Sequence, residues 1–395
     1  MDNLYQLHSV QPENTKAKYN EYDIIDLVLP FEGRAIQLNS IRVHFDLLTD
    51  LVAFGAESGG GQGAVDPTKQ LNVFYNNLAG GHSVVDTITT SLNSTGQIEN
   101  LTNYPRYVAM KTGATMDKDD LVNSGSACEG KCSLQKFTNV LLRGSQSGTI
   151  DGVVGSGGIV KDDIKCEVFN CSIKPDFCLN NASAGGALPV LSHSKSGNIR
   201  ISLRLSRSAA TLFGSEWLTT NKYHLENLKL TFISRPDQVT PKLSMETKIS
   251  IKQSVVSDFS NIAAVVPAVC KSVSCSFQPQ SAENVSAEDN LRTYRLPFLT
   301  QTQFIWNDST NKMITYIIKN QAEVIERYLN SFNYRGVSVA TLPNLSSNKG
   351  FGVGVDFGEY IDLSQQKFSL QLQSSVGTEQ VPFVAYLYFH GLISM

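Results

Sequence analysis

The sequence predicts an all-β protein made of two similar domains in tandem, with a few short helices. Apolar and polar residues alternate over residues 199–205 and again over residues 367–373, which is typical of strands with one buried face. Each of these runs is followed by a turn-rich loop and a closing strand-like run, at residues 228–232 and 383–389. The same order of elements therefore ends both halves of the chain.

A short proline-flanked segment separates the two halves. Pro236 and Pro241 cannot donate a hydrogen bond to a sheet, and each favours extended geometry in the residue before it. The segment therefore predicts a stiff linker between two β domains. The division that we expect is an N-terminal arm at residues 1–24, a first domain at 25–235, a linker at 236–242 and a second domain at 243–395.

Composition limits the classes of protein that the chain can belong to. Its 395 residues are enough for two or three domains, and no apolar run approaches the ~20 residues of a membrane span. The N-terminus lacks the basic and apolar regions of a secretion signal. A net charge of −3 argues against a dedicated nucleic-acid binder, and we expect no sequence-specific nucleic-acid partner. Only 17% of the residues are charged, which suits a surface that becomes interface but also fits any neutral β protein.

Several elements of the first half can be predicted in order. Residues 1–22 are polar and have no period, so we expect a mobile arm that becomes ordered only when something holds it. Ile41, Val43 and Phe45 alternate with polar residues and predict a strand with one wet face. Pro105 stands at a suitable helix start, and a moderately helical pattern continues from Tyr104 to about Leu121.

Residues 123–187 lose all periodicity. They are rich in Gly and Ser and hold five of the seven cysteines. Because this stretch is too long for a plain connector, it predicts an insertion or a functional loop in the first domain.

The strongest helix prediction falls in the second half, at residues 319–332. Val324, Tyr328 and Phe332 recur at helical spacing and form an apolar stripe. We expect this stripe to pack on a sheet.

No motif predicts catalysis or a cofactor. Residues 125–132 approach a phosphate-binding loop, but Cys132 stands where the magnesium-binding hydroxyl is needed and no apolar strand precedes the loop. The six histidines are scattered, and none lies at metal-ligand spacing. His390 alternates with aromatic residues in the last strand and is expected to be a packed or interface histidine. We therefore expect a protein that is not an enzyme and has no catalytic, cofactor-binding or metal-binding residues.

The cysteines leave two alternatives open. The spacing in the insertion is not that of a structural zinc site, so disulfides and free thiols both remain. The hypothesis that we carry forward is an outward loop with one or two bridges, because a segment without a core needs another constraint. Cys270 and Cys275 lie on opposite faces of one extended strand and are too far apart to bridge each other. The candidate disulfide residues are Cys128, Cys132, Cys166, Cys171 and Cys178.

The order of these segments resembles the double jelly-roll major capsid proteins of tailless double-stranded DNA viruses, the lineage of adenovirus hexon, tectivirus and polinton-like virus capsids. The resemblance extends over most of residues 25–395 as architecture and is best in the second half. The segments that carry it are residues 83–88, 103–107, 269–277, 316–332 and 351–373.

The resemblance implies two tandem eight-stranded jelly rolls and a major capsid protein. Its expected partners are further copies of itself, as a homotrimer whose six rolls form a pseudo-hexagonal block, and then a lattice of such trimers in an icosahedral shell. Penton proteins, minor capsid proteins and an internal membrane are further partners of such proteins. The expected location is the virion, after assembly inside the host cell. The alternative is a two-domain β-sandwich that binds carbohydrate or a receptor, such as a spike or lectin; its aromatic residues should then lie on loops rather than in strands.

Overall fold

The structure is a computed structural model of the chain. The residues that it describes are 5–50, 76, 78–116, 128–131, 169–212, 222–238, 240, 242–255, 259–264, 269–283, 291, 299–307, 313–318, 321–332, 352–363, 367–374 and 382–395.

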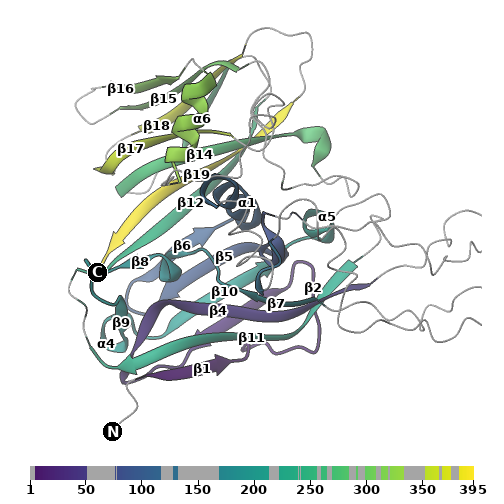
Figure 1. Cartoon of the computed structure of the whole chain (residues 1–395), viewed down its shortest axis with the longest axis vertical. Coiled ribbons are helices and arrows are strands. Elements are labelled where there is room, and N and C mark those ends of the chain that lie inside the picture. Colours follow the sequence, from purple (N-terminus) through teal and green to yellow (C-terminus); the bar gives the residue numbers. More distant parts are fainter. Residues whose placement is uncertain are drawn as a thin grey trace, which may run out of the picture.

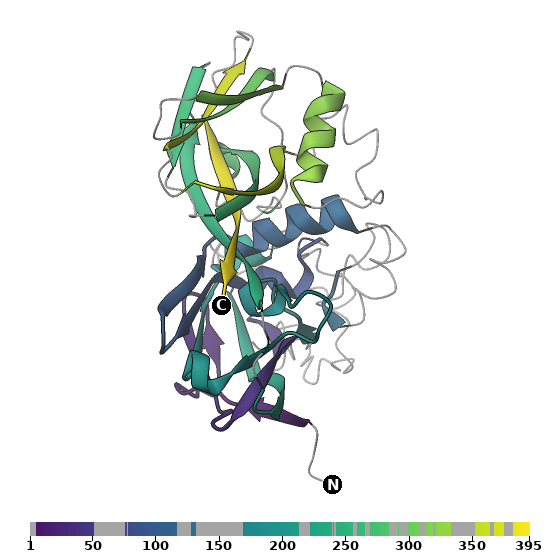
Figure 2. The same ribbon diagram turned by 90° about the vertical axis from the view of Figure 1, so that its left-hand side faces the viewer.

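The first half of the chain forms a β-sandwich, in the lower part of Figures 1 and 2. One wall is a six-stranded sheet and the other is one half of a nine-stranded sheet. Burial alternates along the strands, so that Ile41, Val43 and Phe45 of one wall join the same apolar core as Ile201 and Leu203 of the other. The six-stranded sheet contains β1 (Gln6–Val10), β11 (Lys222–Pro236), β4 (Arg34–Asp50) and β7 (Phe169–Ile173), with β2 (Tyr19–Asn20) on β11 and β9 (Val190–Ser192) on β4. The facing half-sheet contains β6 (Gly96–Leu101), β5 (Val85–Leu92), β10 (Ile199–Leu205) and β3 (Ile24–Leu29).

The second half forms another β-sandwich, in the upper part of both views. Its walls are a four-stranded sheet and the other half of the nine-stranded sheet. Leu370 of the first wall and Val273 and Leu387 of the second belong to one apolar core. The four-stranded sheet runs β13 (Phe259–Ala264), β18 (Lys367–Ser374), β15 (Leu299–Asn307) and β16 (Met313–Ile318). The half-sheet that faces it runs β17 (Val353–Asp362), β14 (Val269–Pro279), β19 (Phe383–Ser394) and β12 (Ser244–Val255), with β8 (Ala182–Ser183) on β12.

The nine-stranded sheet passes from one sandwich to the other. β12 and β6 meet in parallel, and their register contains a single residue pair, Ile249 with Asn100. β12 is otherwise paired along its whole length with β19, from Ser244 opposite Ser394 to Val255 opposite Phe383. β8, which belongs to the first half of the chain, also pairs with β12, with Ser183 opposite Ser244 and Ala182 opposite Met245. Since these backbone connections are short, side chains add to the contact between the sandwiches.

Two helices lie on one side of the sheets (Figure 2). α1 (Tyr104–Thr115) lies where the two sandwiches meet, and ten of its twelve residues are buried. α6 (Gln321–Asn330) packs on β17, with Val324 and Tyr328 buried, as the apolar stripe predicts. The helix predicted from Tyr104 to about Leu121 ends at Thr115 in the structure, and residues 117–127 lie outside the described part.

The structure differs from the sequence expectation in the cysteine-rich stretch. Residues 169–173 are a core strand, β7, which pairs with β4 from Val43 opposite Ile173 to Leu47 opposite Phe169. Phe177, Cys178 and Leu179 follow as a buried turn of 3-10 helix, Cys178–Asn180. Part of the predicted insertion therefore belongs to the core of the first sandwich. The sequence did not indicate this because a five-residue strand is too short to produce a recognisable period.

The predicted arm also contains a strand. β1 pairs antiparallel with β11, from Gln6 opposite Ser234 to Val10 opposite Leu230. His8 stacks on Phe232 with ring centroids 4.7 Å apart. An edge strand is held by backbone hydrogen bonds, which need no apolar period, and this explains why the sequence pattern did not reveal it.

Candidate functional site at the junction of the two sandwiches

Helix α1 is the centre of the junction. Its N-terminal end is tied to the second sandwich, because the Tyr388 hydroxyl donates to the Asn103 carbonyl at 2.9 Å. Just before the helix, the Thr102 backbone N–H donates to Ser250 Oγ, also at 2.9 Å. These bonds flank the single β6–β12 bridge and continue the connection between the sheets.

An aromatic cluster surrounds Tyr107 of α1. Its ring centroid lies 5.3 Å from Tyr388, 5.6 Å from His390 and 6.1 Å from Phe332. These partners come from β19 and from the end of α6, so one side chain of the first half contacts two elements of the second. Aromatic pairs at such distances add to the free energy gained from burial alone.

A buried ion cluster lies beside these rings. Lys248 of β12 has no exposed side-chain surface, and its Nζ lies 2.8 Å from Asp176 Oδ1. Lys111 of α1 contacts the other oxygen of Asp176 at 2.6 Å. Burial opposes the ionisation of Asp176, but the two lysines outweigh it and hold its pKa well below the usual value. Asp176 therefore stays charged and joins β12 to α1.

Glu99 of β6 lies next to this cluster. Its two oxygens accept the backbone N–H groups of Cys178 at 2.7 Å and Lys248 at 2.9 Å. Burial raises the pKa of the Glu99 carboxyl despite the nearby Lys248 charge. This side chain thus bridges the last strand of the first half-sheet to β12, where backbone pairing is limited to one residue pair.

A second polar cluster fixes residues 128–131 against the first sandwich. Glu129 contacts Lys131 at 3.0 Å and His82 at 3.3 Å, and accepts the Lys174 backbone N–H at 3.0 Å. Burial lowers the pKa of His82, so its imidazole is neutral at neutral pH. Tyr104 links the two clusters, since its hydroxyl lies 2.6 Å from His82 Nδ1 and accepts the Asp176 backbone N–H at 3.0 Å.

These clusters hold charge without offering a reactive group. The Lys131 side chain is buried against Glu129 and does not present its charge as a phosphate-binding lysine would. Burial and the neighbouring Glu99 raise the pKa of the Cys178 thiol well above its usual value, so this cysteine is not a nucleophile. Within the described ranges, no group of three or more His, Cys, Asp and Glu side chains could hold a metal ion. No helix in the described part of the chain is long and apolar enough to cross a membrane.

Of the candidate disulfide residues, the structure brings Cys128 and Cys171 near each other, because Cys128 is among the groups that raise the pKa of Cys171. The structure has Cys128 as an exposed free thiol, and Cys171 and Cys178 as buried free thiols in the core. Cys132 and Cys166 lie outside the described residues, so the disulfide hypothesis stays a prediction. Cys270 and Cys275 are buried free thiols of β14.

Sequence reasoning missed most residues of the junction. Asp176 and Lys248 are 72 residues apart, and no spacing rule connects them. The one available signal was a lysine in the middle of an otherwise half-buried strand, at position 248. His390 was expected to be packed, and it is buried between Tyr107 and Phe332.

Two β-sandwiches joined through one continuous sheet, with a buried helix at the joint, fit the double jelly-roll architecture that the sequence predicts. The chain is similar over 99% of its length, and over 90% of the other chain, to the Faustovirus major capsid protein, with a TM-score of 0.56 and 11% sequence identity. The mavirus major capsid protein matches with a TM-score of 0.42 and 10% identity, over 98% of this chain and 90% of that one. The major capsid protein P2 of bacteriophage PM2 matches with a TM-score of 0.39 and 9% sequence identity, over 98% of both chains. Only the first of these is similar enough to define the fold.

No protein-family model and no curated protein matches the sequence. The match to the Faustovirus protein nevertheless confirms the predicted fold class. It also confirms the resemblance to double jelly-roll capsid proteins at the level of the fold.

Proposed function

We propose that this chain is a major capsid protein, a non-enzymatic building block of an icosahedral viral shell. The observation that carries the proposal is the fold, which is shared with the Faustovirus major capsid protein over 99% of this chain. We further propose that residues 25–235 and 243–395 each form one roll, linked by residues 236–242 and preceded by an arm at residues 1–24.

The junction supports this role. A shell protein must keep its two rolls in a fixed relation, because an error in their angle is repeated at every position of the lattice. Buried charges that satisfy one another favour one arrangement over others, since any slip would leave a charge unpaired. Asp176 with its two lysines supplies such a constraint between β12 and α1.

The finer proposal is a homotrimer. Three chains with two rolls each would form a ring of six similar units, which packs with near-sixfold symmetry from one threefold interface. Trimers would then contact further trimers, penton proteins and minor capsid proteins, with a membrane beneath the shell where the virus has one. The protein would be assembled in the host cell and reside in the virion.

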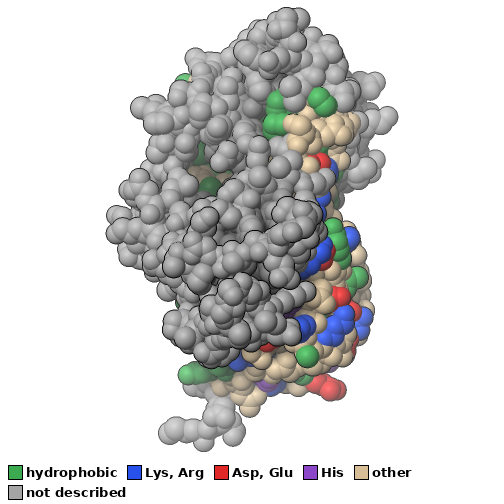
Figure 3. Space-filling view, turned by 90° about the vertical axis from the view of Figure 1, so that its right-hand side faces the viewer, with side chains coloured by type: hydrophobic (Ala, Val, Ile, Leu, Met, Phe, Trp, Pro, Cys, Tyr) green, Lys and Arg blue, Asp and Glu red, His purple; other side chains and the backbone are tan. Residues whose placement is uncertain are grey.

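The charge on one described strip of the surface is mixed in sign. On the face in Figure 3, basic and acidic side chains are intermingled along the described strip rather than separated by sign. Neutral composition and mixed charge suit contacts between copies of one protein.

Light scattering on the purified protein tests the oligomeric state. The expected mass is three times 43.2 kDa, and negative-stain images of the same sample should show a block with a six-sided outline. A stable monomer at micromolar concentration would contradict the trimer. Absence of the chain from purified particles would contradict the capsid role itself.

A further inference from the structure

A pocket opens between the two sandwiches, at the N-terminal end of α1. Its volume is about 190 Å³, and its walls come from both halves of the chain. Asp86, Ser206 and Arg207 belong to the first half, whereas Lys252, Gln278 and Tyr386 belong to the second. The pocket is distinct from the ion cluster around Asp176, since none of the residues of that cluster lines it.

Three cations line this pocket, against one carboxylate. Arg106, Arg207 and Lys252 contribute the positive charges, and Asp86 contributes the negative one. Glu283, which lies just outside the lining and pairs with Lys252, reduces this excess to one positive charge, on a protein whose overall net charge is −3. Concave sites lined by one sign of charge concentrate the opposite ion.

The cations on the second-sandwich side are held in place. The Arg106 guanidinium lies over the Tyr386 ring, 4.1 Å from its centroid, and donates to Gln278 Oε1. Lys252 Nζ lies 3.0 Å from Glu283 and 5.5 Å from the Tyr386 ring centroid. These contacts fix the two cations on one wall before any ligand arrives.

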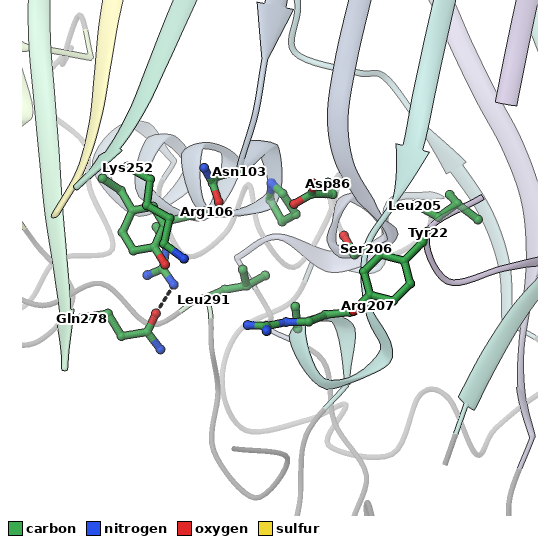
Figure 4. A pocket seen from close by; sticks show the side chains of 13 residues that line it. Tyr22, Asp86, Asn103, Arg106, Leu205, Ser206, Arg207, Lys252, Gln278 and Leu291 are labelled. Atoms are coloured by element: carbon green, nitrogen blue, oxygen red, sulfur yellow. Dashed lines mark hydrogen bonds between the residues drawn. The ribbon is translucent and has the colours of Figure 1, made fainter. Parts of the chain in front are cut away.

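Arg207 approaches from the opposite wall. Figure 4 shows its side chain extending across the pocket toward Leu291 and the wall that holds Arg106. Its backbone carbonyl accepts the N–H groups of Ala210 and Thr211, which fixes the position of its Cα. Among the described residues, no hydrogen bond or ion pair engages the Arg207 guanidinium, although its five donors need acceptors.

Two further polar atoms in the pocket wall lack partners among the described residues. They are Gln278 Nε2 and Ser206 Oγ, and their residues are 1% and 2% exposed. An unpaired buried polar atom is costly. Both atoms are covered by their surroundings, so a ligand in the pocket could satisfy them only after a small movement of the wall. The arrangement that favours an oxyanion is the Arg207 guanidinium on one wall opposite the fixed Arg106 and Lys252 on the other.

We propose that this pocket binds a phosphate group, held between Arg207 on one wall and Arg106 and Lys252 on the other. Guanidinium groups match the geometry of phosphate oxygens and bind them in pairs of hydrogen bonds. A water molecule in the liquid occupies about 30 Å³, so the cavity has room for a phosphate group and for part of an attached organic group. Tyr22, Leu205 and Leu291 line the pocket and would contact such a group. This proposal does not depend on the capsid role.

Calorimetric titration of the full chain at low salt tests the proposal, with inorganic phosphate, phenyl phosphate and acetate as probes. Phosphate and phenyl phosphate should both bind, and acetate should bind at least about tenfold more weakly, because it has fewer charges and fewer acceptor oxygens. Tighter binding of phenyl phosphate than of inorganic phosphate would identify a phosphorylated organic molecule as the source. The reverse order would identify the free ion.

The informative variant is Arg207→Gln, because this side chain has no described partner to lose. It should weaken phosphate binding by at least about tenfold, whereas Arg207→Lys should retain part of it. Arg200→Gln is the matched control, since Arg200 is an exposed arginine paired with Glu13 and does not line the pocket. It should leave binding unchanged.

Protection against thermal unfolding provides a second readout that does not require the variants to be as stable as the parent. Phosphate should raise the Tm of the parent chain and of Arg200→Gln, and raise that of Arg207→Gln less. Three results would overturn the proposal: no phosphate binding to the parent, equal affinity for acetate and phosphate, or equal binding by Arg207→Gln and the parent.

Discussion

The interiors of the two sandwiches and the junction between them are stabilised in different ways. The interiors consist of alternating apolar side chains, such as Ile201 and Leu203 of β10, whose burial requires no particular partner. The junction contains buried charges, such as Asp176 and Lys248, which are stable only with each other. The interior therefore provides the stability of each roll, while the junction determines how one roll sits on the other. If this distinction is right, changes at the two places should have different consequences.

Breaking the ion cluster should have the largest effect on stability. Asp176→Asn leaves Lys248 buried with no opposite charge at contact distance, and it also removes the charge that pairs with Lys111. The free energy of unfolding should fall by about 3–5 kcal/mol, measured by chemical denaturation.

Glu13→Gln is the control for this variant, because the Glu13–Arg200 pair is about half exposed. Its cost should be no more than about 1 kcal/mol. If Asp176→Asn cost no more than the control, the junction would not depend on its charges. A double variant, Asp176→Leu with Lys248→Met, should recover part of the loss, because no charge on β12 is then left unpaired.

A cavity inside the first sandwich should cost somewhat less. Leu203→Ala removes a side chain that is 1% exposed, and the free energy of unfolding should fall by about 3 kcal/mol. The two variants should differ in a second property. Leu203→Ala should leave the oligomeric mass unchanged where it remains folded, whereas Asp176→Asn should reduce the fraction of the proposed trimer, because it frees the angle between the rolls. Loss of trimer in Leu203→Ala alone would reverse the comparison.

The sequence predicted the interiors better than the junction, and the reason is physical. A strand with one wet face has a period of two, which made β10 recognisable over its full length. β19 is buried on both faces from Val384 to His390, because α1 and α6 cover the side that would otherwise be wet, so alternation does not describe it. Likewise, α1 is buried on nearly all sides and has no clear apolar stripe.

The clusters at the junction could not be predicted because their members are distant in sequence. Glu99, Asp176 and Lys248 come from three separate elements and meet only after both sandwiches have formed. In the cysteine-rich stretch, β7 has only five residues and polar surroundings in the sequence, so the hydrophobic pattern of the sequence does not reveal it. The sequence could predict the two rolls and the fold class, but not the residues that orient one roll on the other.

Acid should weaken the junction gradually. Burial and the nearby charges of Lys248 and Lys111 lower the pKa of His390 to about 3, although Asp176 acts in the other direction. In the unfolded chain this histidine has its ordinary pKa near 6.5, so between about pH 6.5 and pH 3 it is protonated in the unfolded chain but neutral in the folded chain. Stability from this group is present above about pH 6.5 and is lost as the pH falls toward 3, at up to about 1.4 kcal/mol per pH unit.

His390→Gln should flatten this dependence between about pH 6 and pH 4, measured by denaturation at each pH. His193→Gln is the control, because His193 lies near the surface, and it should keep the slope of the parent. An unchanged slope in His390→Gln would show that other groups account for the acid sensitivity.

The smallest effects on the free energy of unfolding should come from changes at Cys128. Its reactivity tests where the buried interior of the first sandwich ends and the surface begins. Cys128 is exposed, whereas Cys171 and Cys178 are buried, and burial raises the pKa of both buried thiols. An alkylating reagent should therefore modify Cys128 in the native protein and reach Cys171 and Cys178 only after unfolding, with Cys270 and Cys275 as buried controls in the other sandwich. Cys128→Ser should change the free energy of unfolding by less than about 0.5 kcal/mol. Peptide mapping without reductant, on protein from purified particles, then decides between thiols and bridges. A bridge between Cys128 and Cys171 would join two residues that already lie near each other, since Cys128 is among the groups that raise the pKa of Cys171. A bridge that includes Cys178 would instead mean that the turn after β7 opens toward the cysteine-rich stretch. The boundary between interior and loop would then lie deeper in the first sandwich than the structure places it.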